Sequence, residues 1–287
     1  MERSGTLYLV PVPIGNDEDI TLRALRCLEE VDVVAAEDTR DFGRLARRHG
    51  IRTPSLSYHD HNERQRAPEL LRRLQEGKSV ALVSDAGTPL FSDPGYRLAR
   101  AAAETGIGLV ALPGASAVTT ALAASGLPPI PFRFCGFPPR TGAARRAWFE
   151  TLAHDDATLV LFEAPHRLLG CVEDALRVLG DREACLARNL TKPHEALQRG
   201  TLAGLATRLS EEGEVRGEVT VVIAGSPAGS AGVGAAAAER SAALLLRAGV
   251  ARRVVSELLT TIHGLRRREA YDLILRTLAD QGLDREP

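Results

Sequence analysis

The sequence predicts an α/β protein in which helices pack on largely parallel or mixed sheets, followed by a small helical segment. Three observations support this fold class. Apolar runs rich in β-branched residues alternate with amphipathic stretches from residue 6 to residue 225. Two segments rich in proline, glycine or small residues interrupt the alternation, and only helical spacing continues after residue 234. A repeated strand-then-helix order is typical of helices layered on a sheet.

The expected strands are short apolar runs, and amphipathic stretches between them are the expected helices. Strands are expected at residues 7–12, 31–36, 79–84, 107–112, 130–135, 157–163, 183–187 and 218–224. Helices are expected at Leu22–Leu28, Gly43–His49, Pro68–Leu74, Tyr96–Glu104 and Leu168–Leu179. This order predicts sheets covered by the intervening helices.

Two breaks in composition divide the chain. Residues 126–131 hold four prolines or glycines in six positions, and residues 226–234 are almost all small, which is typical of a flexible linker. We therefore expect an α/β domain over residues 1–128 and a second over residues 129–225. A linker over 226–234 and a helical domain over 235–287 follow.

Apolar residues recur at helical spacing from Leu244 to Leu278, and Gly249 and Gly264 divide this last segment into three short helices. The pattern is typical of a small helix-turn-helix-like bundle. Three cationic residues open its last helix: Arg266, Arg267 and Arg268. Because a positive cluster opposes the helix dipole there, it favours a contact with nucleic acid. A docking or capping bundle is the alternative.

Length and charge exclude several classes of protein. The chain has 287 residues, 44% hydrophobic and 25% charged, with a net charge of −1. This composition is that of a globular chain with a core, not of a histone-like protein or an acidic tail. No apolar run reaches about 18 residues, so no membrane-spanning helix is expected. A start without signal-peptide layout and four cysteines without metal-binding spacing predict a cytoplasmic protein.

The loop after the first expected strand carries neither of the common nucleotide-binding motifs. The sequence holds no GxxxxGK[ST] loop, and no GxGxxG follows this strand. Pro11-Val12-Pro13-Ile14-Gly15-Asn16 stands there instead. Its prolines end the strand in a stiff loop, and Gly15 lets backbone come close to a ligand.

The strongest motif follows the strand expected at 79–84. Residues 84–95 read Ser-Asp-Ala-Gly-Thr-Pro-Leu-Phe-Ser-Asp-Pro-Gly and precede the helix expected from Tyr96. A simple connection between strand and helix needs only about two to six residues. Because open α/β sheets bind ligands at the carboxyl ends of their strands, we expect this loop to present backbone groups to a polar ligand.

Two further loops follow the same logic. Pro113-Gly114-Ala115-Ser116-Ala117 follows the strand at 107–112, and its small residues allow close approach at a helix N-terminus. Phe162-Glu163-Ala164-Pro165-His166-Arg167 places three ionisable groups at the end of another strand. A salt-bridged helix start is the alternative for the second loop.

Taken in this order, the loops resemble the tetrapyrrole-methylase superfamily of S-adenosylmethionine-dependent methyltransferases. Within it they most resemble the small-subunit ribosomal RNA (cytidine-2′-O)-methyltransferases. The resemblance covers essentially the whole chain. It is carried by the 84–95 loop and by residues 13–16, 19–25, 36–40, 58–63, 165–167, 190–192, 194–195, 199–202, 248–250 and 267–271. Asn189 departs from the family pattern, in which Glu is usual.

The resemblance implies two α/β/α domains with the cofactor, S-adenosyl-L-methionine, in the cleft between them. The implied cofactor contacts are Ile14, Gly15, Asp85, Ala86, Gly87, Thr88, Pro89, Ser116, Ala117, Phe162 and Glu163. Members of this group are generally homodimers. The implied target is the ribose of a decoding-centre cytidine in the 16S rRNA of the small ribosomal subunit.

Methyl transfer from a sulfonium to a ribose hydroxyl depends chiefly on alignment, which is worth about 7–11 kcal/mol. Because the hydroxyl is a poor nucleophile, a base should add about 10²–10⁴-fold. The candidates are Glu37, Asp38, Glu163, His166, Lys192 and Glu195. Lys192 is one of only two lysines among 36 cationic residues, and unlike arginine it can release its proton. Alternatively, Lys192 only pairs with Glu195.

Arginines and aromatic residues are the expected RNA contacts. The expected phosphate contacts are Arg40, Arg140, Arg145, Arg146, Arg266, Arg267 and Arg268. Five aromatic residues stand among such cations within 18 positions: Phe132, Phe134, Phe137, Trp148 and Phe149. They can stack on a splayed base, but core packing is favoured for Phe132, Phe134 and Phe149.

Two other functions stay open. A small-molecule methyltransferase acting on a tetrapyrrole shares the cofactor loops but does not need the segment 235–287. A non-enzymatic rRNA-binding assembly factor keeps the basic surface but does not bind S-adenosylmethionine. His59 and His61 are close in sequence, but a third ligand is not evident, so no metal is expected.

Overall fold

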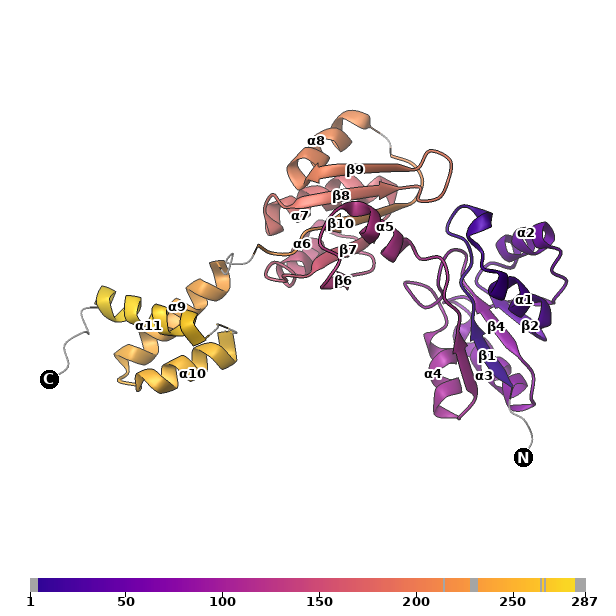
Figure 1. The fold of residues 1–287 in the computed structure, drawn as a ribbon, viewed down its shortest axis with the longest axis horizontal. Coiled ribbons are helices and arrows are strands. Elements are labelled where there is room, and N and C mark those ends of the chain that lie inside the picture. Colours follow the sequence, from indigo (N-terminus) through magenta and orange to yellow (C-terminus); the bar gives the residue numbers. More distant parts are fainter. Residues whose placement is uncertain (1–4, 214, 228–231, 264, 266, 282–287) are drawn as a thin grey trace. The chain divides into compact units, whose positions relative to one another are not determined.

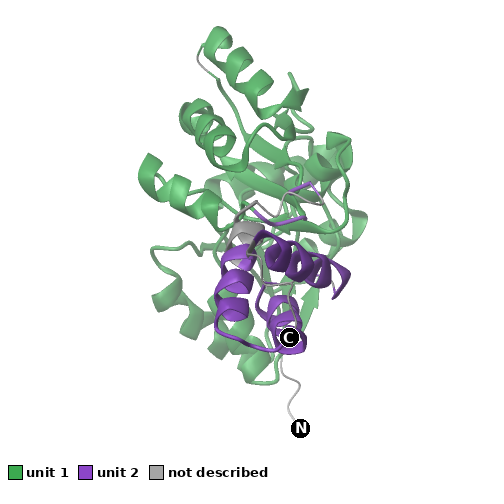
Figure 2. Ribbon diagram, turned by 90° about the vertical axis from the view of Figure 1, so that its left-hand side faces the viewer, with its two compact units in different colours: residues 1–153, 157–225 green, residues 154–156, 226–287 purple. Residues whose placement is uncertain are grey.

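The computed structural model describes residues 5–213, 215–227, 232–263, 265 and 267–281 (Figure 1). The chain divides into two compact units, coloured green and purple in Figure 2. The first comprises residues 1–153 and 157–225, and the second comprises residues 154–156 and 226–287. Within the described residues, the first unit holds two five-stranded sheets and the second holds three helices.

The first sheet is entirely parallel, with the strand order β3-β2-β4-β1-β5. Its strands are β1 (Thr6–Leu9), β2 (Val33–Ala36), β3 (Ser55–Ser57), β4 (Val80–Val83) and β5 (Gly108–Ala111). The connections contain the 3-10 helix η1 (Asp17–Asp19) and the helices α1 (Leu22–Glu30), α2 (Thr39–His49), α3 (Glu63–Gln75) and α4 (Tyr96–Glu104). The expected alternation of strands and helices is thus confirmed.

Helices cover both faces of this sheet. Along β4, Val80 and Leu82 face a core that includes Leu98 of α4. The alternate residues Ala81 and Val83 face a second core, formed with α1 and α2. In Figure 1, α2 and α4 accordingly lie on opposite sides of the strands. Because β4 is buried on both faces, its sequence is a continuous apolar run rather than an alternating one.

The second sheet is mixed, with the order β6-β7-β10-β8-β9. Its strands are β6 (Phe132–Phe134), β7 (Thr158–Glu163), β8 (Glu183–Arg188), β9 (Ala196–Thr201) and β10 (Val219–Ile223). Strands β6 and β7 are parallel, whereas β10 runs antiparallel to both β7 and β8. The beginning of β10, at Val219, therefore pairs with Glu163 and Arg188, the last residues of β7 and β8.

Helices also cover both faces of the second sheet. The helices of this half are α5 (Ala117–Ser125), α6 (Gly142–Glu150), α7 (Leu168–Leu179) and α8 (Leu202–Glu212), with the 3-10 helix η2 (Pro165–Arg167). Helices α6, α7 and α8 share one core with β7, β8 and β10. On the other face, Val118 and Leu122 of α5 pack with Val160 and Val222, and Ile14 joins this core. Helix α5 thus packs on the second sheet although it precedes the domain boundary predicted at residue 128.

The second unit contains α9 (Gly232–Arg247), α10 (Arg252–His263) and α11 (Arg267–Gln281). Their core includes Ala242, Leu259 and Ile274, all essentially without solvent exposure. The three helices expected after residue 234 are thus present. Of the apolar residues at helical spacing, however, Leu244 and Ile262 are exposed rather than packed in this core.

Three local features differ from expectation. Strands β3 and β9 were not expected, because both are rich in polar residues. Helix α3 begins at Glu63, five positions before the expected start, and contains Pro68 in its interior. No helix in the described part of the chain is both long and apolar enough to span a lipid bilayer.

Candidate active site

Three of the loops singled out in the sequence are joined at the ends of the first sheet's strands. Val12 and Gly87 exchange two backbone hydrogen bonds, each of 3.0 Å, so the loop after β1 pairs with the loop after β4. The Thr88 hydroxyl donates to the Ala115 carbonyl oxygen at 3.0 Å, which links the second loop to the loop after β5. The three loops therefore form one connected wall.

Carboxylates at the ends of β2 and β4 hold the start of the 84–95 loop. The Asp85 N–H donates to Glu37 Oε2 at 3.2 Å, and the Asp38 N–H donates to Asp85 Oδ1 at 2.9 Å. Each strand end thus supplies a carboxylate to a backbone donor of the other. Burial raises the pKa of Glu37 to about 7; the hydrogen bond from Asp85 opposes this effect, and the negative charges of Asp93, Asp85 and Asp60 reinforce it.

An apolar cavity of about 370 Å³ opens beside this wall. It is lined by Ile14, Ala86, Gly87, Thr88, Phe91, Ser92, Asp93, Ser116, Ala117, Val118, Phe137, Phe162, Glu163, Ala164, Pro165, Gly217, Glu218, Val219 and Thr220. Phe162 packs against Phe137, with ring centroids 5.6 Å apart. Among these lining residues the ionisable side chains are Asp93, Glu163 and Glu218, all acidic, so the cavity suits a ligand with positive charge and an apolar body.

Glu163 is the most deeply buried of these carboxylates, with no exposed side-chain surface. Its Oε1 accepts from the Ala164 N–H at 2.7 Å, and its Oε2 accepts from Arg167 at 3.0 Å. The same Arg167 nitrogen donates to the Pro138 carbonyl oxygen at 2.7 Å. A buried carboxylate is tolerated here because it is paired and hydrogen-bonded.

A second, polar cavity of about 590 Å³ adjoins the first. It is lined by Val12, Pro13, Ile14, Gly15, Asp17, Asp41, Phe42, Arg44, Leu45, Arg48, Ser84, Asp85, Ala86, Lys192 and Glu218. Ile14, Ala86 and Glu218 line both cavities. The two cavities therefore adjoin along a wall formed by these three residues.

Gly15 allows the loop between β8 and β9 to reach the polar cavity. A Cβ on Gly15 would lie 2.3 Å from Lys192 Cγ and 2.8 Å from Thr191 Oγ1, closer than such atoms approach. The Asn16 N–H donates to Thr191 Oγ1 at 3.0 Å, which fixes the contact. Lys192 thus reaches the polar cavity only because residue 15 lacks a side chain.

Lys192 pairs with Glu218, not with Glu195 as the alternative reading of the sequence held. The Glu195 carboxylate instead accepts from the Thr191 N–H at 2.5 Å and so holds the loop that carries Lys192. Neither Glu37, Glu195 nor His166 is among the described residues that line the two cavities. Glu37 and Glu195 support loops, and His166 is exposed in η2.

The residues expected to contact a cofactor lie mostly at the apolar cavity. Its lining includes Ile14, Ala86, Gly87, Thr88, Ser116, Ala117, Phe162 and Glu163. Gly15 and Asp85 line the polar cavity instead, and Pro89 is absent from both sets of described lining residues. Sequence reasoning did not assign Phe91 or Glu218 individually to the site, and it considered Phe137 only as a possible RNA contact. Phe91 lies within the strongest motif, whereas Glu218 reaches the site only because β10 is antiparallel to β7.

The arginines expected to contact RNA fall into different environments. Arg140, Arg267 and Arg268 are exposed, and Arg40 is exposed but bonded to Asp38. Arg266 lies outside the described residues. Arg145 was expected at the RNA surface, but it is buried and pairs with Asp174 at 2.7 Å, so its guanidinium is not available to a phosphate. Arg146 pairs with the same carboxylate at 3.0 Å and keeps partial exposure.

Known proteins share both the sequence and the fold. Ribosomal RNA small subunit methyltransferase I of Micromonospora olivasterospora is 51% identical over 271 residues, 94% of this chain and 87% of that protein. The protein of the same name from Escherichia coli O157:H7 is 43% identical over 273 residues, 94% of this chain and 95% of that one. A crystal structure of uroporphyrin-III C-methyltransferase from Thermus thermophilus, complexed with S-adenyl homocysteine, has a TM-score of 0.54 at 23% identity, covering 77% of this chain and 97% of that one.

Fold and site together define an α/β protein with a parallel sheet, a mixed sheet and a ligand cavity at the strand ends. The sequence profile of the tetrapyrrole (corrin/porphyrin) methylases matches residues 6–206. The chain belongs to this family, as the resemblance of its loops predicted.

The raised pKa of Glu37 predicts a pH-dependent stability. An ordinary carboxyl titrates near 4.5 and Glu37 near 7, so the folded state retains a proton that the unfolded state loses between these values. The contribution of Glu37 to stability is therefore greatest below pH 4.5 and is lost as the pH rises to 7. We expect the melting temperature of the native protein, relative to that of Glu37→Gln, to fall over this interval. Glu76→Gln, at an exposed ion pair, should behave like the native protein.

A side chain at residue 15 should displace the Lys192 loop. We expect Gly15→Ala to lower stability by about 1–3 kcal/mol, because the added methyl overlaps Lys192 Cγ. Gly43→Ala is the matched control, since its nearest neighbour would be 3.6 Å away. Urea unfolding of both variants measures the effect. Equal stabilities would contradict the close approach described here.

The burial of Arg145 makes Asp174 a structural residue. Asp174→Ala leaves a buried guanidinium without its carboxylate, and we expect it to cost about 3–5 kcal/mol in urea unfolding. Glu212→Ala removes the partner of Arg188 in a more exposed pair of the same half and should cost about 1 kcal/mol or less. A small effect of Asp174→Ala would return Arg145 to the candidate RNA surface.

Proposed function

We propose that this chain transfers a methyl group from S-adenosyl-L-methionine to the ribose 2′-oxygen of a decoding-centre cytidine in 16S rRNA. Two relatives that match nearly its whole length carry the name ribosomal RNA small subunit methyltransferase I. The observation that carries the proposal is the shared wall of Ile14, Ala86 and Glu218 between an apolar and a polar cavity. Such a wall brings a bound donor and a polar acceptor side by side.

The apolar cavity fits S-adenosyl-L-methionine by its chemistry. Its volume falls within the usual range for small-ligand sites, about 300–1,000 Å³. Phe137 and Phe162 offer aromatic surface to a base. The acidic lining, which includes Asp93 and Glu163, suits a positively charged sulfonium and amine. When bound, S-adenosyl-L-methionine supplies a methyl group on a positively charged sulfur.

The chain's own contribution is alignment and exclusion of water. The bonded loops after β1, β4 and β5 fix one wall of the donor cavity before any ligand binds. Such preorganisation can account for about 7–11 kcal/mol of barrier reduction. Of the six candidates for the base, Lys192 is the one found among the described residues that line the polar cavity, and we propose that it acts there. Glu37 and Glu195 position loops, and we assign no chemical step to His166.

The exposed arginines are the proposed contacts to the phosphates of the rRNA. Arg40, Arg140, Arg146, Arg267 and Arg268 retain exposed guanidinium surface for this purpose. Each phosphate contact releases counterions from the RNA. The affinity of the protein for rRNA should therefore fall as the ionic strength rises. We further propose, from the resemblance to the family, that the protein acts as a homodimer in the cytoplasm on the small ribosomal subunit.

The proposal is tested by locating the transferred methyl group. We expect incubation with isotopically labelled S-adenosyl-L-methionine and unmodified small subunits to label one ribose of 16S rRNA, as read by mass spectrometry of nuclease fragments. Uroporphyrin-type tetrapyrroles offered in parallel should stay unlabelled. Label on a tetrapyrrole alone would support a small-molecule methyltransferase. Failure to bind the donor in calorimetry would support an assembly factor without enzymatic activity.

A further inference from the structure

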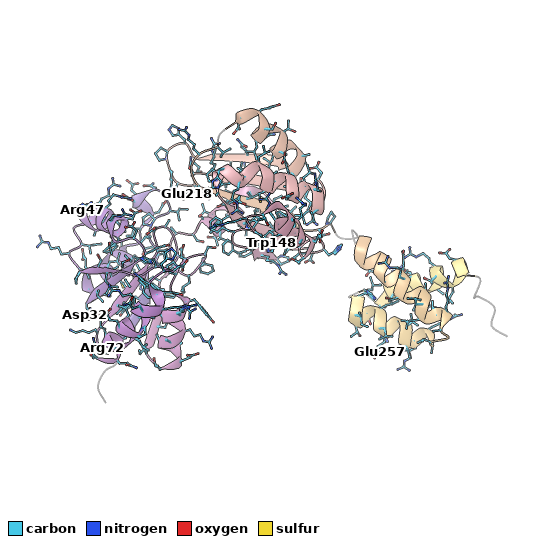
Figure 3. All side chains as sticks on the ribbon, turned by 180° about the vertical axis from the view of Figure 1, so that it is seen from behind. Asp32, Arg47, Arg72, Trp148, Glu218 and Glu257 are labelled. Carbon is cyan, nitrogen blue, oxygen red and sulfur yellow. The ribbon has the colours of Figure 1, made fainter. Side chains whose placement is uncertain are left out.

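Glu218 occupies a unique place among the described residues that line the two cavities. It is the one ionisable side chain found in both linings, while Ile14 and Ala86, the other shared residues, are apolar. Glu218 directly precedes β10 and is labelled in Figure 3. Because Val219 pairs with Glu163 and Arg188, this carboxylate lies beside the ends of β7 and β8.

The backbone around Glu218 is held in place by Asn189. The Asn189 N–H donates to the Glu218 carbonyl oxygen at 3.0 Å, and the Glu218 N–H donates to Asn189 Oδ1 at 3.2 Å. Gly217 has a φ of +96°, and a Cβ there would lie 1.9 Å from Asn189 Oδ1. The corner at residues 217–218 therefore requires both glycine and a compact amide partner. Asn189, a departure from the family pattern, has a defined role as the residue that positions Glu218.

The ion pair with Lys192 decides which partner can accept a proton. In the pair, Lys192 Nζ donates to Glu218 Oε1, and the carboxylate keeps further acceptor capacity. The other carboxylates of the two linings are less suitable. In the polar cavity, Asp17 pairs with Arg48, Asp41 pairs with Arg44, and Asp85 accepts from the Asp38 N–H, and none of the three lines the apolar cavity. Glu163 uses its two oxygens for Ala164 and Arg167, and Asp93 lines the apolar cavity alone. Lys192 thus serves to hold and orient the Glu218 carboxylate at the shared wall.

We propose that Glu218 accepts the proton of the acceptor hydroxyl and that the polar cavity holds the acceptor ribose; this inference rests on the function proposed above. As the new O–C bond forms, the hydroxyl proton passes to Glu218, and the breaking S–C bond leaves its electron pair on sulfur. One positive and one negative charge disappear together, so the net charge of the site is unchanged. Glu218 then returns the proton to water, since its side chain is 64% exposed.

Three variants test the role in turnover. Glu218→Gln keeps the shape but not the acceptor, and we expect its single-turnover rate on small subunits to fall by about 10²–10⁴-fold. Glu218→Asp should recover part of the rate. Glu212→Gln, which removes an acid paired with Arg188 outside both sets of lining residues, should leave the rate unchanged.

A spectroscopic readout tests the position of the pair independently of turnover. The chain has only two lysines, Lys78 and Lys192, so reductive methylation with carbon-13 formaldehyde gives two assignable side-chain signals. We expect Glu218→Gln, or added S-adenosyl-L-methionine, to move the Lys192 signal and leave that of Lys78 in place. Asp32→Asn, which removes the partner of Lys78, should do the reverse.

The outcomes separate this inference from the proposed function. If the native protein methylates 16S rRNA and Glu218→Gln does so at the native rate, Glu218 is not the proton acceptor. An unmoved Lys192 signal in Glu218→Gln would also overturn the pair as described. If the native protein transfers no methyl group to rRNA but the lysine signals shift as expected, the proposed function fails and the placement of Glu218 and Lys192 stands.

Discussion

The contact between residues 14–16 and residues 190–192 is the constraint on which the site depends. The two segments come from different sheets and meet where a single methyl group would not fit. Through this contact the second half contributes Lys192 to a cavity whose remaining wall is largely built by the first half. Conversely, Ile14 belongs to a loop of the first sheet, but its side chain packs in the core between α5 and the second sheet. Neither sheet alone would form the two adjoining cavities.

The carboxylates at the strand ends show how the local environment gives chemically equivalent groups different pKa values and different roles. Glu37, partly buried among other acids, holds its proton to a pKa of about 7 and fixes a loop. Burial likewise raises the pKa of Asp93 to about 6. Glu163 is buried but neutralised by Arg167, and it faces the apolar cavity. Glu218 alone combines exposure, a cationic partner and access to both cavities. Position along the sequence does not distinguish these four roles, whereas burial and pairing do.

The sequence was most informative where burial imposes a pattern. Strand β4 is apolar throughout and β7 is apolar from Leu159 to Phe162, because both faces of each are covered. Both strands were expected close to their observed bounds, and the loops that follow them line the site. Strands β3 and β9 gave no such signal, since their residues are mostly polar and only partly buried or exposed. Arg145 could not be recognised as buried, because its partner Asp174 is 29 residues away. Placing Glu218 at the site requires knowing that β10 runs antiparallel to β7, and the local sequence pattern does not encode strand direction.

The path of helix α5 limits how this protein can be dissected. It follows the last strand of the parallel sheet, yet Val118, Ala121 and Leu122 complete the core over Val160 and Val222. An N-terminal fragment that ends near the proline-rich stretch at 126–131 would include α5, although this helix covers the second sheet. The C-terminal fragment would then expose an apolar face of that sheet to water and would be prone to aggregate. Proteolysis or splitting by inteins should therefore be aimed ahead of residue 117, so that the helix stays with the strands it shields.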